Sequence, residues 1–569
     1  MPYRLIAEEL PEPRPTPFAK RTPKYLILLL PVFLFLISYP LSLYFSLRCA
    51  SSQFLRGNFS TSQTCASFSL ALSRPLPTIS PYVVVYRQLA QSLFLANQFA
   101  SSALPYLQSF LGRGPASSAD ITNVTFSLSR LSDSLAFLQA SLQPLPRLAP
   151  LLTRVNTART LAQKISPLVN SLPDLLSLHG KSTILLLLQD PTELRPTGGF
   201  LSHIALLTLD SGRLTNVQIY DTAATDSQLR GQISPPSDLA RVIGESNWYL
   251  RDANWDPDFP SSADRALWFV TKELSLTPDR VVGVHLATLA ELLSITGSIR
   301  LSELNLTLTR ANFLSQYLAH PDFLSAFYQR FFDELRELNT SQLSQAAGQI
   351  ISALESRQIF ISSTIWSGGV APPNCRSTLP CLSHYFYPVA SNVGVNKANV
   401  STQATAQLSV QLNPARADFA YQLDLSNTSS QTNWPAGHYK NYLRLYLPPQ
   451  SLPDAVLLNG QPASAYYVTA EHGLVVLGVL VDVAPVSTVK VNVRWHQPLV
   501  LSSRFHYQLD IPNQPGQSSY PVTVTLIYPK TWFASTATTP TLASQGTLQY
   551  NQTLSRQLRF DIDFATNVN

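Results

Sequence analysis

The stretch YLILLLPVFLFLISYPLSLYFSL at residues 25–47 constrains this chain most, because none of its 23 residues is charged. A helix rises about 1.5 Å per residue, so this run can cross a hydrocarbon core of about 30 Å. Pro31 and Pro40 are tolerated in membrane helices. A cleaved signal peptide is the alternative. Its apolar region usually has only about 7–15 residues, and the residues after Arg48 are a poor cleavage match. We predict a transmembrane helix at 25–47.

The charges that flank this run predict its orientation. Lys20, Arg21 and Lys24 precede it closely, whereas Arg48 and Arg56 are the nearest basic residues after it. Basic residues concentrate on the cytoplasmic side of a membrane helix. We therefore expect a cytoplasmic tail at 1–24, one helix in the bilayer, and the bulk of the chain outside the cell membrane.

The cysteines fall into two local pairs. Cys49 and Cys65 are one pair, and Cys375 and Cys381 are the other. A four-thiolate metal site is the alternative, but it would require CxxC-like spacing in each half, which neither half has. Paired cysteines suit an oxidising compartment outside the cytoplasm. We predict the disulfides Cys49–Cys65 and Cys375–Cys381.

Composition argues against one class of partner. Charged residues make up only 13% of the chain and the net charge is +6. Basic residues do not form a stripe interleaved with aromatic residues, as they do in proteins that bind nucleic acid. We expect no nucleic-acid partner.

Periodicity predicts a multidomain chain. Apolar residues spaced three and four apart predict a helical stalk, interrupted at Pro105 and near residue 145. Alternating strands and helices then predict an α/β layered domain. Short alternating strands with frequent turns predict a C-terminal β-sandwich region. The expected order is stalk 48–180, α/β domain 181–310, helical segment 311–365, linker with a disulfide 366–398, and β-sandwich region 399–569.

One loop carries the strongest signal for a ligand. QDPTELRPTGGF directly follows the apolar run at 184–188. Glycines let the backbone approach a ligand, and an arginine can hold a phosphate or carboxylate with two hydrogen bonds. A plain turn is the alternative. The candidate ligand-binding residues are Glu193, Arg195, Thr197, Gly198 and Gly199, together with Arg251, Asp252 and Asn254 from a second loop.

That second loop, DANWDPD, also suggests a divalent cation. Oxygen-bearing side chains alternate along it, and Asp252, Asp256 and Asp258 are the candidate ligands for Mg²⁺ or Ca²⁺. Pro257 stands where the sharp-turn glycine of an EF-hand would be, which excludes that motif. The alternative is that these side chains cap the following helix and its turn.

Several blocks resemble a known family. ELRPTGGF, RDANWDPDFPSSADRA, VVGVHLATLAELLSITG, VASNVGVNKANV and GHYKNYLRLYLP are similar, in this order, to bacterial family 4012 of domains of unknown function. The resemblance implies a membrane-anchored protein of the cell envelope. The α/β part also resembles LytR-CpsA-Psr phosphotransferases, in which Arg195 would match a pyrophosphate-binding arginine. The aspartate expected close behind it is replaced by Thr197-Gly198-Gly199.

Two functions follow as expectations. The first is an extracytoplasmic envelope protein that binds an anionic ligand, such as a cell-wall polymer or lipid-linked phosphate, or acts as a surface scaffold. The second is a phosphotransferase acting on a glycopolymer linked to polyprenyl pyrophosphate, so whether the chain is an enzyme stays open. In either case we predict that Arg195 lies beside Asp252, Asp256 or Asp258, because ligands bind at the carboxyl ends of strands in open α/β sheets.

Overall fold

The computed structural model describes residues 24–113, 118–178, 180–362, 367–371, 375, 377–536 and 538–566, with side chains omitted for 24–37, 118–120 and 321. Two compact units are present. The first contains residues up to Ala100 together with Arg130–Thr160. The second contains Ser101–Ser129 and Leu161–Asn569. Each unit is described by itself below.

Helices build the N-terminal part, as the periodicity predicts. They are α1 (Lys24–Leu55), α2 (Phe59–Ser73), α3 (Pro81–Phe110), α4 (Ser118–Leu142) and α5 (Ala149–Leu175), with a short 3-10 turn at Pro146–Leu148 between the last two. The break near residue 145 is therefore present. The predicted break at Pro105 was wrong, because α3 continues through that residue. One missing hydrogen bond is tolerated in a helix held by its neighbours.

The transmembrane prediction is tested only in part. Among the described residues, no helix has the length and apolar character needed to cross a membrane. Side chains 25–37 of the predicted span lie outside the description. The expected boundary between span and stalk at 47/48 falls inside α1, which is continuous from Lys24 to Leu55.

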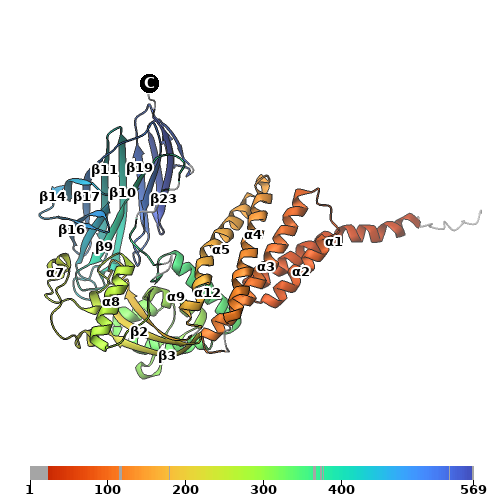
Figure 1. Ribbon diagram of the computed structural model, residues 1–569, viewed down its shortest axis with the longest axis horizontal. Coiled ribbons are helices and arrows are strands. Elements are labelled where there is room, and N and C mark those ends of the chain that lie inside the picture. The colour runs from red at the N-terminus through yellow and green to blue at the C-terminus, as the bar shows by residue number, and fades with distance from the viewer. Residues whose placement is uncertain are drawn as a thin grey trace, which may run out of the picture. The chain divides into compact units, whose positions relative to one another are not determined.

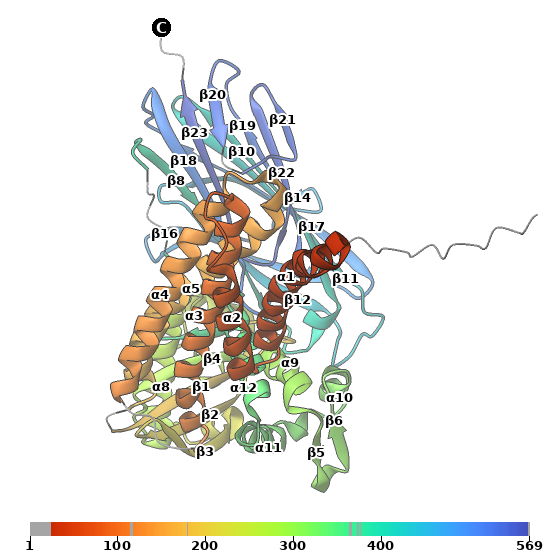
Figure 2. The same ribbon diagram turned by 90° about the vertical axis from the view of Figure 1, so that its right-hand side faces the viewer.

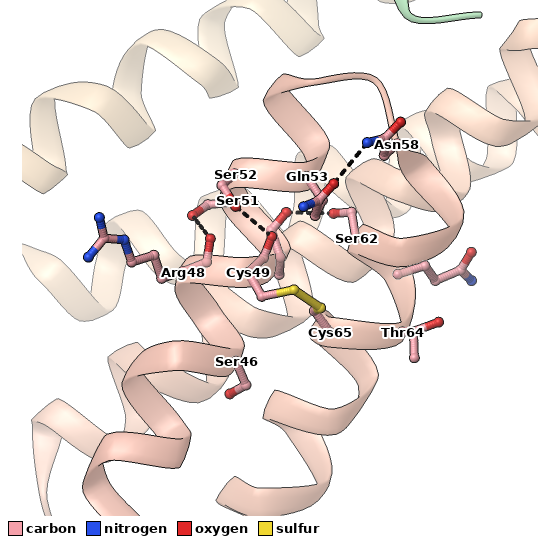
Figure 3. The surroundings of a disulfide bond; sticks show 12 residues. Ser46, Arg48, Cys49, Ser51, Ser52, Gln53, Asn58, Ser62, Thr64 and Cys65 are labelled. Carbon is pink, nitrogen blue, oxygen red and sulfur yellow. Dashed lines mark hydrogen bonds between the residues drawn. A yellow bond between two sulfur atoms is a disulfide. The ribbon is translucent and has the colours of Figure 1, made fainter.

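Small polar side chains let α1, α2 and α3 approach closely. Ser62 of α2 is fully buried, and its hydroxyl donates to the carbonyl oxygen of Ala50 at 2.6 Å. Tyr86 of α3 donates to the carbonyl oxygen of Leu43 at 2.9 Å. The disulfide Cys49–Cys65 joins α1 to α2, as Figure 3 shows. The second predicted disulfide, Cys375–Cys381, is also present.

We expect the two disulfides to contribute unequally to stability. Cross-linking residues 16 apart constrains the unfolded chain by about 3 kcal/mol, and residues 6 apart by about 2 kcal/mol. Replacing Cys49 and Cys65 by serine should therefore lower the free energy of unfolding more than replacing Cys375 and Cys381. Urea denaturation measures the difference. Alkylation of all four thiols without reductant would contradict the pairing.

The α/β part of the second unit contains a mixed sheet of five strands within the described residues, in the order β3-β2-β1-β4-β7. β1 runs parallel to β4, and the remaining pairs are antiparallel. Figure 1 shows β2 and β3 with α8 and α9 nearby. The strands are β1 (Lys181–Asp190), β2 (Phe200–Asp210), β3 (Arg213–Asp221), β4 (Arg280–His285) and β7 (Ile359–Ile361), and the hairpin β5 (Ile299–Leu301) and β6 (Leu306–Leu308) lies apart.

The apolar run of β1 is explained by burial on both faces of this sheet. Leu185 and Leu187 pack with Phe269 of α8 on one face. Leu186 and Leu188 pack against α9, α11 and α12 on the other. A strand covered on both faces reads as a continuous apolar run. The helices are α6 (Thr222–Asp226), α7 (Ser237–Ile243), α8 (Phe259–Leu274), α9 (Leu286–Thr296), α10 (Phe313–Ala319), α11 (Leu324–Arg336) and α12 (Thr340–Glu355).

The C-terminal part is rich in strands, as predicted. An eight-stranded sheet, β14-β13-β17-β11-β10-β19-β22-β21, accompanies two four-stranded sheets, β15-β16-β12-β9 and β20-β23-β18-β8, among the described residues. Figure 2 shows β18, β23, β20 and β8 side by side. Buried side chains of all three sheets form one core, with Trp495 of β17, Leu445 of β12 and Tyr507 of β18 among them.

The predicted linker 366–398 was wrong in part, because β8 (Cys381–Tyr385) and β9 (Tyr387–Asn392) lie inside it. Both strands are edges whose residues pair with distant partners, which local sequence does not reveal. The others are β10 (Thr402–Asn413), β11 (Arg416–Asn427), β12 (Tyr439–Leu447), β13 (Leu452–Leu458), β14 (Gln461–Pro462), β15 (Tyr467–Glu471), β16 (Leu474–Val483), β17 (Ser487–Pro498), β18 (Arg504–Ile511), β19 (Tyr520–Ile527), β20 (Phe533–Thr536), β21 (Leu542–Ser544), β22 (Thr547–Leu554) and β23 (Leu558–Ala565).

Candidate functional site

The loop after β1 and the loop before α8 meet, as predicted. Arg195 is 2% exposed, and its Nε donates to Oδ1 of Asp252 at 3.0 Å. Its Nη2 donates to Oε1 of Glu193 at 3.1 Å, and its Nη1 donates to the backbone oxygens of Asn392 and Leu194. Every nitrogen of the guanidinium group therefore has a partner within the protein.

Burial and charge act against each other at this arginine. Desolvation by itself would lower the pKa of Arg195. The nearby carboxylates of Asp252 and Glu193 raise this pKa by more than desolvation lowers it, so the group stays charged. Burial raises the pKa of Glu193 by more than Arg195 and Lys397 lower it. Glu193 is consequently the carboxyl group of this loop that most readily takes up a proton.

A second set of contacts surrounds Asp190, the last residue of β1. Its Oδ2 accepts from Nζ of Lys397 at 2.5 Å and from the hydroxyl of Tyr317 at 2.5 Å. Its Oδ1 accepts from the backbone nitrogen and the hydroxyl of Thr192 at 2.9 and 2.6 Å. Burial acts to raise the pKa of Asp190, but Lys397 outweighs it, so the pKa is lowered.

We call Asp190, Glu193, Arg195, Asp252, Tyr317 and Lys397 the polar cluster. It lies where the α/β part contacts the strand-rich part of the same unit. Backbone contacts reinforce it, because the amide of Asn392 donates to the carbonyl oxygen of Leu194 at 2.9 Å. Gln514 donates to the carbonyl oxygens of Arg195 and Ala390 at 3.2 and 2.7 Å. The cluster thus links four segments that are far apart in sequence, at residues 190–195, 252, 317 and 397.

Sequence reasoning missed Lys397, Asp190 and Tyr317. Lys397 lies within VASNVGVNKANV, a block that carries the family resemblance, but nothing local identifies its partner 207 residues earlier. Tyr317 lies on α10, 127 residues after Asp190. A charged residue that directly follows a fully apolar strand was the available signal for Asp190.

The glycine pair is explained by packing. A Cβ on Gly198 would lie 1.9 Å from Nε2 of His285, and a Cβ on Gly516 would lie 2.0 Å from the oxygen of Gly198. Gly198 also has φ of +128°, which disfavours other residues. Burial lowers the pKa of His285 to about 4, so its ring is neutral against this turn. Gly198 and Gly199 therefore form a turn packed on both sides.

Thr197 and Asn254 hold the same turn. The amide nitrogen of Asn254 donates to Oε1 of Gln189 at 3.1 Å, to Oγ1 of Thr197 at 3.0 Å and to the oxygen of Gly199 at 2.8 Å. Both side chains are buried. Their hydrogen bonds stabilise the loop, and no contact directs them toward an external ligand.

Arg251 belongs to a neighbouring cluster. Its Nη1 lies 3.0 Å from Oδ2 of Asp226 and its Nη2 lies 2.9 Å from Oε1 of Glu245. Burial raises the pKa of Asp226 to about 7 and the pKa of Glu273 to about 8. Arg251 approaches Asp252 only at 4.0 Å, so it joins the polar cluster weakly.

The predicted metal site was wrong. Within the part of the chain that the structure describes, no group of three or more His, Cys, Asp or Glu side chains could hold a metal ion. Asp252 pairs with Arg195, and Asp258 caps α8 by accepting from the amide of Ser261 at 3.0 Å. Asp256 lies 2.8 Å from Nε2 of His472, and this hydrogen bond raises the pKa of the histidine. The capping alternative holds for Asp258, and Asp256 accepts from the backbone nitrogen of Asp258 in the same turn, whereas Asp252 pairs with Arg195 instead.

The comparisons with known proteins give a family match for one region of the chain and no activity. Residues 179–320 match the model of the family described as "Protein of unknown function (DUF4012)", which confirms the first resemblance. The match does not support the resemblance to LytR-CpsA-Psr phosphotransferases. No curated protein matches the chain.

Solved structures are similar only in part. An M1 zinc metallopeptidase from Deinococcus radiodurans is 10% identical with a TM-score of 0.20, over 29% of this chain and 42% of that chain. Native leukotriene A4 hydrolase from Saccharomyces cerevisiae is 7% identical with a TM-score of 0.20, over 29% of each chain. The chain thus spans less than half the length of these proteins, and we draw no functional conclusion from them.

Proposed function

We propose that this chain, whose residues 179–320 carry the DUF4012 region, is a single-pass, membrane-anchored scaffold of the bacterial cell envelope with its bulk outside the cytoplasm. The observation that carries the scaffold proposal is that all three side-chain nitrogens of Arg195 already donate to protein groups. An arginine that binds phosphate needs donors free to reach it. Here Asp252, Glu193 and two backbone oxygens take them.

The polar cluster supports a mechanical role for this region. Buried ion pairs often add little net stability, but breaking one leaves an uncompensated charge in the interior. Such pairs can favour a single arrangement of two parts over alternatives. Lys397 reaches the carboxylate of Asp190 across the contact between the α/β and strand-rich parts, and Arg195 reaches the backbone oxygen of Asn392 across it. A scaffold that transmits force along the chain would benefit from this fixed geometry.

Exposed apolar side chains support the membrane anchor. Leu41, Tyr44 and Phe45, which lie inside the predicted span, are 47%, 55% and 57% exposed, and Phe68 of α2 is 56% exposed. Large apolar residues on a surface are typical of contact with lipid or protein. The two disulfides support an oxidising compartment for the rest of the chain.

Two measurements test the proposal. Protease added to intact spheroplasts should digest the strand-rich region, and protection of that region would contradict the topology. Titration of the detergent-solubilised full-length chain with inorganic pyrophosphate, with and without Mg²⁺, should show no saturable binding. Saturable binding that the Arg195→Lys variant loses would replace the scaffold by an anion-binding function, because lysine keeps the charge but not the planar donor pair.

A further inference from the structure

The contact between Lys397 and Asp190 joins two parts of the fold that are far apart in sequence. Nζ of Lys397 lies 2.5 Å from Oδ2 of Asp190, one covalent bond away from the carboxyl carbon. A second carboxyl group is close, because Oε2 of Glu193 lies 3.6 Å from the same Nζ. An amine, a carboxyl group and a second acid are therefore within reach of one another.

This site is sheltered from water. The side chain of Asp190 is 1% exposed, that of Glu193 is 6% exposed, and that of Lys397 is 11% exposed. The aromatic ring of Tyr317 lies 5.4 Å from Nζ and that of Phe200 lies 5.9 Å from it. In such surroundings an ammonium and a carboxylate lose most of their hydration, so a reaction that removes both charges relieves a desolvation cost.

We propose that Lys397 and Asp190 condense into an intramolecular amide, an isopeptide bond, with Glu193 relaying the proton. The bond would join the end of β1 to the segment that follows β9. It is a covalent modification of the chain by its own residues, and it does not depend on where the protein resides.

The atoms balance without a co-reactant. One proton passes from Nζ of Lys397 to Oδ2 of Asp190, giving an amine and a carboxylic acid. The nitrogen lone pair then attacks the carboxyl carbon, forming the N–C bond and placing negative charge on Oδ1. A second proton moves from nitrogen through Glu193 to Oδ2. The C–O bond breaks with its electron pair on oxygen, water leaves, and the carbonyl on Oδ1 re-forms.

The hydrogen bonds around Asp190 suit these steps. Oδ1 already accepts from the backbone nitrogen and the hydroxyl of Thr192, so two donors point at the atom on which negative charge develops. The hydroxyl of Tyr317 donates to Oδ2, the oxygen that leaves. Burial and Asp190 raise the pKa of Tyr317, so the phenol keeps its proton and remains a donor.

The charge balance of the polar cluster assigns the relay to Glu193. Three carboxyl groups face two cations, Arg195 and Lys397. If Glu193 holds a proton, Asp252 balances Arg195 and Asp190 balances Lys397. Condensation then removes the second pair of charges altogether, which relieves the desolvation cost of a buried ion pair. The raised pKa of Glu193 fits a group that holds and returns a proton.

Mass spectrometry decides the proposal. The full-length chain, purified, denatured and reduced, should have a mass lower than that of its sequence by one water molecule. Trypsin should fail to cut after Lys397, and tandem spectra should show a branched peptide that joins the segments carrying Asp190 and Lys397. Lys164, which pairs with Glu355 at 3.1 Å but is 49% exposed, is the internal control and should remain unmodified.

Two variants separate the chemistry from the ion pair. Lys397→Arg keeps a cation beside Asp190 but offers no amine to acylate, so its mass should equal that of its sequence. Glu193→Gln retains Lys397 and Asp190 but cannot relay a proton, and it should lose the branched peptide. A wild-type chain with the full sequence mass and a quantitative cut after Lys397 overturns the proposal. Loss of water mapped to another pair of residues overturns it as well.

Discussion

Replacing Gly198 by alanine should strongly destabilise the second unit. The new Cβ would lie 1.9 Å from Nε2 and 2.5 Å from Cε1 of His285, a ring that is itself 1% exposed. The ring cannot rotate into solvent, so the turn or β4 must shift. Overpacking together with an unfavourable φ predicts a loss of about 3 kcal/mol or more in the free energy of unfolding.

Gly231→Ala is the matched control for this substitution. Gly231 also has a positive φ, at +97°, but a Cβ there meets no atom within 4 Å. This substitution should lower the free energy of unfolding only by the cost of placing alanine in a left-handed backbone conformation, about 1–2 kcal/mol. Urea denaturation followed by tryptophan fluorescence compares the two variants. Equal losses would mean that the contact with His285 yields readily, and that packing is not the reason for glycine at 198.

The sequence was most informative where a signal is local. The alternation of strands and helices predicted an α/β layered domain, and β1, β2 and β3 lie inside its predicted bounds. The short separation within each cysteine pair predicted both disulfides. In each case the residues that determine the structure lie within about one secondary-structure element of one another in the sequence.

Prediction failed where the cause is a distant partner. β9 pairs with β12 some fifty residues later, so its own residues read as a linker. Helix α3 tolerates Pro105 because the surrounding fold, rather than the local hydrogen bond, keeps it helical. The aspartates of DANWDPD were assigned to a cation although each finds its own partner, one of which is His472 from the turn between β15 and β16.

The candidate site shows the same division. Arg195 beside Asp252 was predictable, because two polar loops were expected at the same edge of the sheet. The place of Lys397 in the site was not predictable, because the sequence predicted the strand-rich part and the α/β part as separate regions. The residues that most resemble a ligand-binding loop turn out to bind another part of the same chain.

Replacing Arg195 by methionine should lower the stability of the second unit by about 3–5 kcal/mol, because it leaves Asp252 and Glu193 buried without their cation. Methionine fills most of the same space, so the loss of stability reflects the missing charge more than a missing side-chain volume. Arg310→Met is the matched control. Arg310 lies 2.7 Å from Glu291, but the two side chains are 59% and 47% exposed. An exposed pair contributes little to stability, so this variant should unfold at nearly the same urea concentration as the wild type.

The pH dependence of the Arg195→Met variant identifies the mechanism of the loss. Without the guanidinium group, which lowers the pKa of Glu193, burial raises that pKa in the folded state still further above its value in the unfolded chain. The folded state then binds more protons than the unfolded state, so its stability increases as pH falls from neutral. We expect the deficit relative to wild type to shrink on acidification, as measured by urea denaturation at several pH values. A deficit that does not change with pH would show that Arg195 stabilises the fold through packing and its backbone hydrogen bonds, and that its charge is not what the cluster requires.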